Sequence, residues 1–600
     1  MRMIEYVLIL VFVFPGLALG DKGSNRTVFE LNDGPGRWFR NAAGPVAGAG
    51  SLGVGTPGVE VRFKGESNTV HTMTSLLYPA GAANMPFDTD PQKGSAEVEL
   101  TTPGLYVFFC QIHPYMLGAV VVDDPTTEGL DLGENITLIN GITVPTSSDL
   151  ATRLLRGFFI LTEPANWQNF ASTEPWHVSY PNVNVRIAGG AVVNLPQVLN
   201  ARYGNDTELP ALLTPSREGV GEVWVDTQFE TTADKEKPGT ATAVDATTWE
   251  VTRKVSLPHI EMNNPHNMWT DRDQNLIYVT EWFDSKLTLF ERETGQLIDR
   301  ITVGEAPAHV MTRVDTDQLH VSLNGSDDQE SVVELAPLAN GVEREIDIGR
   351  PGPHAHWMGH DGMTMVTPNV FTGDSTIYDF WRDEVLEIVP TGTLEAHPIA
   401  TGMMPDSSKY YVANFLDSTF TLIETQTGEV LKTINLLQNY NPLTGEITGP
   451  VGGLPIQTPV SPDGIAMVTA NILTDTITIV DTRKDELVAS LPCDAGCHGV
   501  QFGAKKGGGY YAYISSQAAN TLQVVDIDPN GDEDPSDAKV VGRILLTATP
   551  ETAMDDTITA NPGMGGQGLL PIPVVYNGWV QNLPQPWKEQ LTPKQRDPLH

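Results

Sequence analysis

Four side chains between residues 71 and 116 carry atoms that can bind a soft metal ion. They are His71, Cys110, His113 and Met116. A thiolate and two imidazoles form a trigonal plane around copper in blue-copper sites, and a thioether sulfur binds weakly on the axis. The soft thiolate holds copper in both oxidation states. The residue types therefore predict a mononuclear copper site that transfers electrons.

The elements that must position these ligands are β-strands. Val59, Val61 and Phe63 alternate with charged residues, which is typical of a half-buried strand. Further strands are predicted at Glu97–Leu100, Leu105–Phe109 and Ala119–Asp123, separated by Gly and Pro turns. One strand delivers Cys110, and a tight loop then brings His113 and Met116 round. Such a rigid scaffold keeps the ligand geometry nearly fixed during electron transfer.

This segment resembles the cupredoxins, the family of plastocyanin, over about the first fifth of the chain. The resemblance implies a Greek-key β-sandwich with type 1 copper on His71, Cys110, His113 and Met116. Only Pro114 and Tyr115 separate His113 from Met116, which is similar to the binuclear copper-A loop. That loop needs two cysteines, and only Cys110 is present, so the mononuclear site is favoured. The alternative is a buried free cysteine beside two unrelated histidines.

A self-similar unit recurs along the rest of the chain. From Tyr278 the copies are 42 to 56 residues apart. The seven cores are Val223–Thr227, Tyr278–Trp282, His320–Asn324, Met365–Asn369, Tyr411–Phe415, Met467–Asn471 and Tyr513–Gln517. Short strands at this period predict a β-propeller with one four-stranded sheet per repeat. These units resemble the Tyr-Val-Thr-Asn propeller family over about half of the chain. The predicted fold class is all-β, a cupredoxin sandwich plus a seven-bladed propeller.

A histidine precedes the predicted inner strand of nearly every repeat, while the sixth repeat has Leu454 or Ile456 there. The candidates for a second copper site are His266, His309, His354, His356, His397 and His498, with His360 nearby. A ring of imidazoles at one mouth of the propeller channel would suit copper or zinc. The alternative is that each histidine caps backbone groups of its own turn.

A His-rich propeller beside a copper domain is similar in architecture to nitrous oxide reductase. That resemblance implies a propeller copper centre supplied with electrons by the cupredoxin domain. The order of the domains, the single cysteine and the histidine spacing all differ here. The sequence therefore predicts copper-dependent redox chemistry on a small molecule rather than nitrous oxide reduction itself.

The other two cysteines are Cys493 and Cys497. Haem attachment normally has two residues between the cysteines, whereas three intervene here and no second axial ligand is evident, so the sequence disfavours haem. A short disulfide is expected, because Gly496 gives the loop its freedom and an oxidising compartment permits the bond.

An acidic loop has the oxygen spacing of an EF-hand, with Gly531 at its sixth position. The candidate calcium ligands are Asp526, Asp528, Asn530, Asp532, Asp534 and Asp537. A structural calcium loop is one interpretation, and a solvated acidic turn is the other.

The ends and the charge define the setting. Residues 1–20 have the basic start, short apolar run and small final residues of a signal peptide, which indicates a periplasmic or extracellular protein. The predicted divisions are 1–20, 21–125 (copper domain), 126–214 (connector with a helix near Ser148–Leu161), 215–547 (propeller) and 548–600 (tail).

The chain is strongly acidic. Lys and Arg number 36 against 75 Asp and Glu, a net charge of −39. This argues against nucleic acid or an anionic membrane surface as the main partner, since both need a basic face.

The sequence leaves three functions open. In one, the propeller holds a second copper centre and the protein is an oxidoreductase acting on a small molecule. In another, the propeller docks a redox partner protein and the chain is an electron carrier. A structural adhesin with an inactive copper site is a third possibility. No later apolar run could span a membrane after signal cleavage, and a homo-oligomer is compatible with the sequence.

Overall fold

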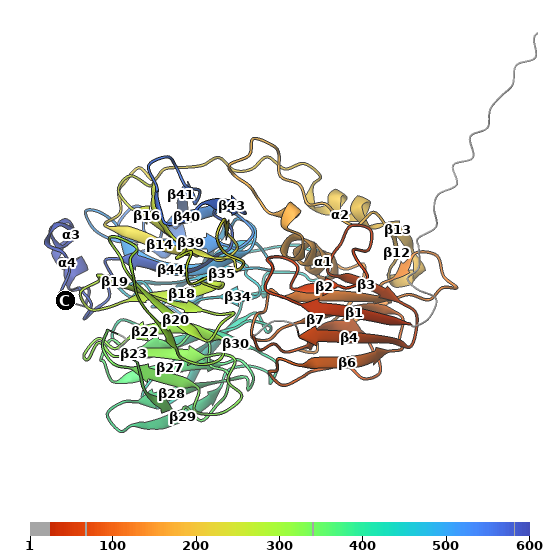
Figure 1. Ribbon diagram of the computed structural model, residues 1–600, viewed down its shortest axis with the longest axis horizontal. Helices are drawn as coiled ribbons and strands as arrows, with labels where there is room; N and C mark the ends of the chain where they lie inside the picture. The colour runs from red at the N-terminus through yellow and green to blue at the C-terminus, as the bar shows by residue number, and fades with distance from the viewer. Residues whose placement is uncertain (1–24, 66–68, 339–340, 581, 600) are drawn as a thin grey trace, which may run out of the picture.

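A computed structural model describes residues 25–65, 69–338, 341–580 and 582–599 (Figure 1). The predicted signal peptide lies outside these residues. The described chain is nearly all β, as the sequence predicted. Among the described residues, no helix is long and apolar enough to cross a membrane.

The N-terminal region is a sandwich of two β-sheets. The first has the strand order β2-β1-β4-β6 and the second β11-β10-β5-β7-β8-β3. Phe63 in the first sheet meets Phe108 in the second, with ring centroids 5.0 Å apart, so aromatic rings fill the space between the sheets. The strands are β1 (Arg26–Leu31), β2 (Phe39–Asn41), β3 (Leu52–Gly55), β4 (Val59–Gly65), β5 (Thr74–Pro79), β6 (Ser95–Leu100), β7 (Gly104–Phe109) and β8 (Leu117–Val122).

The connector contains the predicted helix, α1 (Asp149–Thr162). The Ala151 amide donates a hydrogen bond to the Ser148 hydroxyl oxygen at 3.2 Å, so Ser148 is the N-cap. Strands β10 and β11 extend the second sheet of the sandwich beyond β5. The other elements are β9 (Leu130–Asp131), β10 (Asn135–Leu138), β11 (Thr143–Pro145), β12 (Asn184–Arg186), β13 (Val192–Asn194), α2 (Leu195–Tyr203) and the 3₁₀ turns Pro164–Asn166 and Ala188–Gly190.

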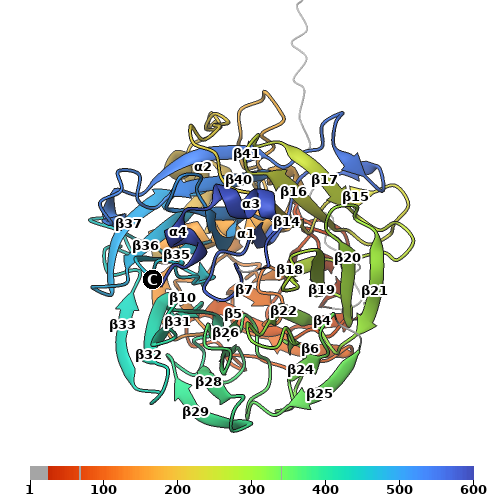
Figure 2. The same cartoon turned by 90° about the vertical axis from the view of Figure 1, so that its left-hand side faces the viewer.

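The larger region is a propeller of small antiparallel sheets around a common axis (Figure 2). The first three four-stranded sheets are β18 (Pro265–Thr270) to β21, β22 (Pro307–Thr312) to β25 and β26 (Trp357–Met358) to β29. Three more are β30 (Pro398–Met403) to β33, β34 (Pro455–Ile456) to β37 and β38 (Cys497–Ala504) to β41. Their second strands are β19 (Leu276–Glu281), β23 (Leu319–Leu323), β27 (Thr364–Asn369), β31 (Lys409–Asn414), β35 (Ala466–Asn471) and β39 (Tyr510–Ser516).

The third and fourth strands complete these sheets toward the rim of the propeller. The third strands are β20 (Lys286–Glu291), β24 (Val332–Leu335), β28 (Asp374–Asp379), β32 (Thr419–Glu424), β36 (Thr476–Asp481) and β40 (Thr521–Asp526). The fourth strands are β21 (Leu297–Thr302), β25 (Val342–Ile346), β29 (Glu384–Pro390), β33 (Val430–Asn435), β37 (Glu486–Pro492) and β41 (Lys539–Leu545).

The first strand of each sheet is the innermost one. Strand β18 contacts both β22 and β44 (Gly566–Ile572), and β38 contacts β44, so these strands line the axis. The repeated cores, expected to be inner strands, instead form the second strand, as Tyr278 does in β19. The histidines expected ahead of the inner strand therefore lie on or beside the innermost strand itself. His266 is in β18 and His309 is in β22.

Residues beyond 547 are part of the propeller, which corrects the predicted division at that point. Strand β44 is the innermost strand of a five-stranded sheet with the order β42-β17-β16-β14-β44. Pairing an early strand with a late one closes the ring and leaves no open edge there. The remaining strands and helices are β14 (Glu222–Thr227), β15 (Thr231–Thr232), β16 (Thr240–Asp245), β17 (Val251–Val255), β42 (Ala553–Met554), β43 (Ile558–Ala560), α3 (Gln585–Gln590) and α4 (Pro593–Arg596), with a 3₁₀ turn at Pro535–Asp537.

The sandwich sits against one mouth of the propeller. In Figure 1 it lies beside the propeller, and in Figure 2 strands β5 and β7 are seen behind the centre of the ring. The Tyr115 hydroxyl donates to the Gln228 side-chain oxygen at 2.9 Å. Lys237 pairs with Asp33 at 2.7 Å. The first contact fixes the loop that carries Cys110, His113 and Met116 to the propeller, and the second fixes the segment after β1.

Candidate metal centres

The first candidate centre lies where the sandwich meets the propeller. Cys110 directly follows β7, and the loop after it folds back: the Met116 amide donates to the His113 carbonyl at 2.9 Å, and the Cys110 amide donates to the Met116 carbonyl at 3.2 Å. His71 reaches the same point from the segment ahead of β5. Ligand atoms of His71, Cys110 and His113 all lie within 4.8 Å of one another, and all three residues are buried.

The distances within this group fit a trigonal metal site. The Cys110 sulfur is 3.9 Å from His71 Nδ1 and 3.6 Å from His113 Nδ1. Bond lengths of about 2.3 Å to sulfur and 2.0 Å to nitrogen, at trigonal angles, place sulfur and nitrogen about 3.7 Å apart. The Thr72 amide donates to the Cys110 sulfur at 3.4 Å, which suits a negatively charged thiolate. Met116 is fully buried in the same loop.

Burial controls the charge of all three groups. It lowers the pKa of His71 to about 4, and lowers the pKa of His113 well below its ordinary value. Both imidazoles are therefore neutral at pH 7, the form that binds metals. Burial also raises the pKa of the Cys110 thiol, so a thiolate here requires a cation to displace its proton.

Aromatic side chains from the propeller cover this centre. The ring of His113 lies 4.7 Å from that of Trp282 and 4.2 Å from that of Phe283, between centroids. The Thr69 hydroxyl donates to the Phe283 carbonyl at 2.5 Å, which ties the segment before His71 to the same turn. The first centre is thus enclosed by propeller residues, and the sandwich alone would leave it open.

The second candidate centre is formed by three of the predicted histidines. Nitrogen atoms of His266, His309 and His354 all lie within 4.8 Å of one another, and all three residues are buried. His266 Nε2 is 3.1 Å from His354 Nε2. Metal–nitrogen bonds of about 2.0 Å place two neighbouring ligand nitrogens about 3 Å apart, so the spacing fits a shared ion.

Hydrogen bonding orients one of these ligands. His354 Nδ1 lies 2.7 Å from the Ile399 carbonyl oxygen, so Nδ1 carries the proton and donates. This leaves the lone pair on Nε2, which faces His266. Metal-binding histidines are commonly fixed in this way by a carbonyl on the other ring nitrogen.

The remaining predicted histidines surround this group without joining it. The ring of His498 lies 6.4 Å from that of His266. His356 Nδ1 is 2.5 Å from the Ser322 hydroxyl oxygen. His397 has a backbone hydrogen bond to Gln111, the residue after the cysteine of the first centre. His360 stacks on Tyr576 at 5.2 Å and belongs to neither group.

Burial keeps the surrounding imidazoles neutral as well. Burial lowers the pKa of His354 to about 4, although its hydrogen bond to the Ile399 carbonyl opposes the shift. Burial lowers the pKa values of His356 and His498 to about 3, and neighbouring imidazoles lower these two further. His266 Nδ1, His356 Nε2 and His498 Nδ1 are buried without a hydrogen-bond partner. None of these three nitrogens caps a backbone group of its own turn, as the capping alternative required, and leaving such atoms unsatisfied costs about 1–3 kcal/mol each.

Sequence reasoning missed two residues at these centres. In the sixth repeat, where Leu454 or Ile456 was expected, the Gln457 amide nitrogen lies 3.3 Å from His309 Nε2. Trp282 is the other. Its ring stacks on that of His266, 3.7 Å away at 26°, and meets that of His113 edge-on, 4.7 Å away. Trp282 ends the Tyr278–Trp282 core, but only the docking of the sandwich shows that it lies between the two centres.

The predicted disulfide is formed. The Cys493 and Cys497 sulfurs are 2.08 Å apart, and Cys497 begins β38 directly before His498. The bond therefore closes a small loop beside the histidine group. Both sulfurs are used in this bond, so neither is free to form the thioether attachment of a c-type haem.

The acidic loop does not have the arrangement expected for a calcium site. Asp526 lies in β40 and pairs with Lys505 at 2.7 Å. The Asp528 carboxylate accepts backbone hydrogen bonds from Gly531, Asp532 and Glu533, and Asp534 caps the 3₁₀ turn that contains Asp537. Asn530 donates to Asp532. The carboxylates thus stabilise their own turn and do not converge on one point, which is the solvated-turn interpretation.

Comparison with known proteins gives no assignment. No protein-family model matches the sequence, and none of the curated proteins does. The match to hydrazine synthase of Kuenenia stuttgartiensis covers 50% of this chain and 89% of that chain, at 16% identity and a TM-score of 0.37. A candidate 6-phosphogluconolactonase from Bacteroides uniformis is similar to 59% of this chain and 99% of that chain, at 16% identity and a TM-score of 0.42. Neither likeness bears on the chemistry of the two centres.

Proposed function

We propose that this protein is an exported copper oxidoreductase. Its N-terminal sandwich is a cupredoxin domain with type 1 copper on His71, Cys110, His113 and Met116. The propeller holds a second copper through His266, His309 and His354. Copper bound at these sites would supply one-electron chemistry, and the second site would act on a small molecule. The periplasm or the cell exterior is the proposed location.

The observation that carries this proposal is the position of Trp282. Its indole is 1% exposed and contacts one proposed ligand of each centre, His113 and His266. The two ring-to-ring separations are 4.7 and 3.7 Å. Packed rings provide a short, water-free route for an electron, and both ends of this route are metal ligands in one chain.

The chain's own residues support a redox role at the second centre. Neutral imidazoles bind a cation without adding charge, so the site would carry the charge of the ion itself. Burial of the group excludes water, which strengthens electrostatic interactions in the site. The proposed likeness to nitrous oxide reductase is one of architecture only and assigns no substrate to this centre.

Metal counting tests the proposal. Purified protein should contain two or more copper ions per chain, with an intense visible band and a narrow copper hyperfine splitting from the Cys110 centre. One copper per chain would favour the alternative, an electron carrier whose propeller is a docking scaffold. The absence of any reducible copper would refute both functions.

Replacing Trp282 tests the electron route. After rapid one-electron reduction of the Cys110 centre, the electron should pass to the histidine centre within the molecule. Trp282→Leu should slow this step while both metals stay bound. Trp269, another buried propeller tryptophan, packs its ring against Trp579 and has no ring contact with a histidine of either group among the described residues, which gives the matched control Trp269→Leu. Equal transfer rates in both variants would contradict a route through Trp282.

A further inference from the structure

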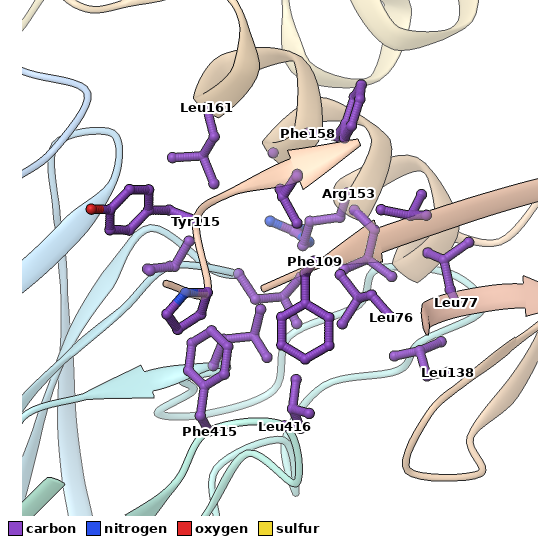
Figure 3. A pocket seen from close by; sticks show the side chains of 18 of the residues that line it. Leu76, Leu77, Phe109, Tyr115, Leu138, Arg153, Phe158, Leu161, Phe415 and Leu416 are labelled. Carbon is purple, nitrogen blue, oxygen red and sulfur yellow. The ribbon is translucent and has the colours of Figure 1, made fainter. Parts of the chain in front are cut away.

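An apolar cavity of about 110 Å³ lies between the sandwich, α1 and the propeller (Figure 3). Strand β7 forms one wall: Leu105, Val107 and Phe109 line the cavity, while Phe108 points the other way, into the sandwich. Side chains of Phe158 and Leu161 from α1 form the opposite wall. This explains why β7 is buried on both faces, which a strand covered on one side would not be.

The cavity connects the protein's rim with the histidine centre. Its lining includes His354, His498 and Trp282, all of them buried. It also includes Arg156 and Asp475, whose side chains are 15% and 25% exposed. The cavity therefore runs from partly exposed residues of α1 and the propeller to a ligand of the second centre.

A glycine keeps part of this space open. Gly157 lies within α1 and lines the cavity, and a Cβ atom added there would meet no atom within 4 Å. Glycine inside a helix is less stable than alanine by about 0.5–1 kcal/mol. No positive φ angle and no close neighbour requires glycine at this position. We therefore attribute the glycine at position 157 to the space that it leaves open in the cavity.

The charges at the rim are already paired. Arg156 forms an ion pair with Asp475 at 2.8 Å, and Arg153 forms one with Asp149 at 3.3 Å. Arg202 shares Asp149 with Arg153 at 3.2 Å. The Arg and Asp side chains of the lining are those of Arg153, Arg156 and Asp475, so the leucine and phenylalanine walls offer an ionic ligand no partner further in. An unpaired ion pays a large desolvation penalty between leucine and phenylalanine walls, whereas a small uncharged molecule does not.

We propose that this cavity delivers a small, uncharged and weakly polar molecule, of gas-like size, to the His354 side of the second centre, and that it excludes anions. This inference rests on the proposed function, because it names the class of reactant for that centre. It assigns Gly157 and the apolar walls a role in admitting the reactant, separate from metal binding.

Xenon tests the cavity without reference to any metal. Apolar cavities of a similar kind stay dry and bind xenon. Crystals of the wild-type protein under xenon pressure should show xenon between α1 and β7. Gly157→Ala should retain it, and Gly157→Phe, which fills the space, should lose it. Leu154→Phe, from the same wall, serves if Gly157→Phe does not fold. A wild-type cavity without xenon would overturn the proposal.

Carbon monoxide and azide test the route. In copper-loaded, reduced protein, carbon monoxide should bind the histidine centre, and Gly157→Phe should slow its association about tenfold or more relative to Gly157→Ala, a barrier increase of about 1.4 kcal/mol. Azide should not reach the oxidised centre in either variant. Unchanged carbon monoxide association, or ready azide binding, would overturn the route even with both metals present. A propeller without metal would instead refute the proposed function.

Discussion

The two centres are built in different ways from the same kinds of side chain. Cys110, His113 and Met116 come from one short loop, with His71 added by the neighbouring segment. His266, His309 and His354 come from three successive sheets of the propeller. The first set is already assembled by local backbone geometry, whereas the second converges only because the innermost strands surround one axis. A local motif therefore identifies its own site, and a repeated residue identifies only a place in the fold.

The centres also differ in what protects them. The thiolate loop belongs to the sandwich but is covered by Trp282 and Phe283 of the propeller. The histidine group lies within the propeller and is reached by a cavity whose wall is β7 of the sandwich. Each region thus completes the surroundings of the other region's site. Removing either region should expose the centre that remains.

The largest expected effect is the loss of one centre's signal while the other centre keeps its metal. Cys110→Ser should abolish the visible thiolate-to-copper band, because the only free cysteine among the described residues is lost. Copper at the histidine centre should remain, since no ligand there changes. Absorption and paramagnetic resonance spectra of the two proteins make the comparison, and an unaltered visible band would reject the ligand assignment.

Within the propeller, the histidines should divide into two classes. His309→Ala should remove the second copper, because His309 belongs to the compact group. His397→Ala should keep it, since His397 lies beside Phe109 and Phe415 and bonds to Gln111. Copper analysis of both variants measures the difference. Equal loss in both would mean that the binding group is the wider ring predicted from the sequence.

Loss of the disulfide should change the surroundings of the second centre and leave those of the first centre unchanged. Replacing Cys493 and Cys497 by serine removes a five-residue closed loop, worth about 2 kcal/mol in the chain-entropy account. His498 follows this loop directly, so carbon monoxide binding at the histidine centre should change while the Cys110 spectrum stays the same. Denaturant unfolding gives the stability loss; a shifted Cys110 spectrum would contradict the separation.

The smallest effect concerns a histidine outside both centres. His320 Nε2 lies 2.9 Å from a Glu334 carboxylate oxygen. Burial would raise the pKa of Glu334, but hydrogen bonds from His320 and Arg344 outweigh it and lower the pKa to about 2. The pair's stabilisation is therefore present above about pH 4.5 and is lost as the pH falls toward 2.

Glu334→Gln should consequently destabilise the protein by about 1 kcal/mol at pH 7 and by less at pH 3. Urea unfolding midpoints at the two pH values measure this, with copper content unchanged. A greater loss at pH 3 than at pH 7 would contradict the sign. The expected result would show that the His320–Glu334 pair stabilises the fold independently of both centres.

The sequence was sufficient for the elements whose signals are local. Alternation at Val59–Phe63 and the run Leu105–Phe109 predicted β4 and β7 correctly, and Ser148 marked the start of α1. The near-regular spacing of the repeats was enough to predict a propeller fold. It could not show which strand is innermost, because every strand of a repeat has the same two-residue period.

What the sequence could not show depends on contacts between distant segments. Trp282 and Gln457 have no distinguishing neighbours in the chain, and their positions follow from docking and from the propeller axis. The acidic loop had the correct spacing for calcium. Its first candidate ligand, Asp526, is instead paired with Lys505, which lies 21 residues earlier in the chain. One signal was available and was not used: Leu105–Phe109 is apolar at every position, which indicates a strand covered on both faces.

Because strand β44 is synthesised late, the two centres can be completed at different times during synthesis. Its residues 566–572 emerge long after residue 116, by which point all four thiolate-site residues already exist in the growing chain. The backbone at Gly568 packs directly against His266, so the histidine pocket stays unfinished until this late strand takes its place. A nascent chain could therefore capture its first ion early, while the second must await ring closure.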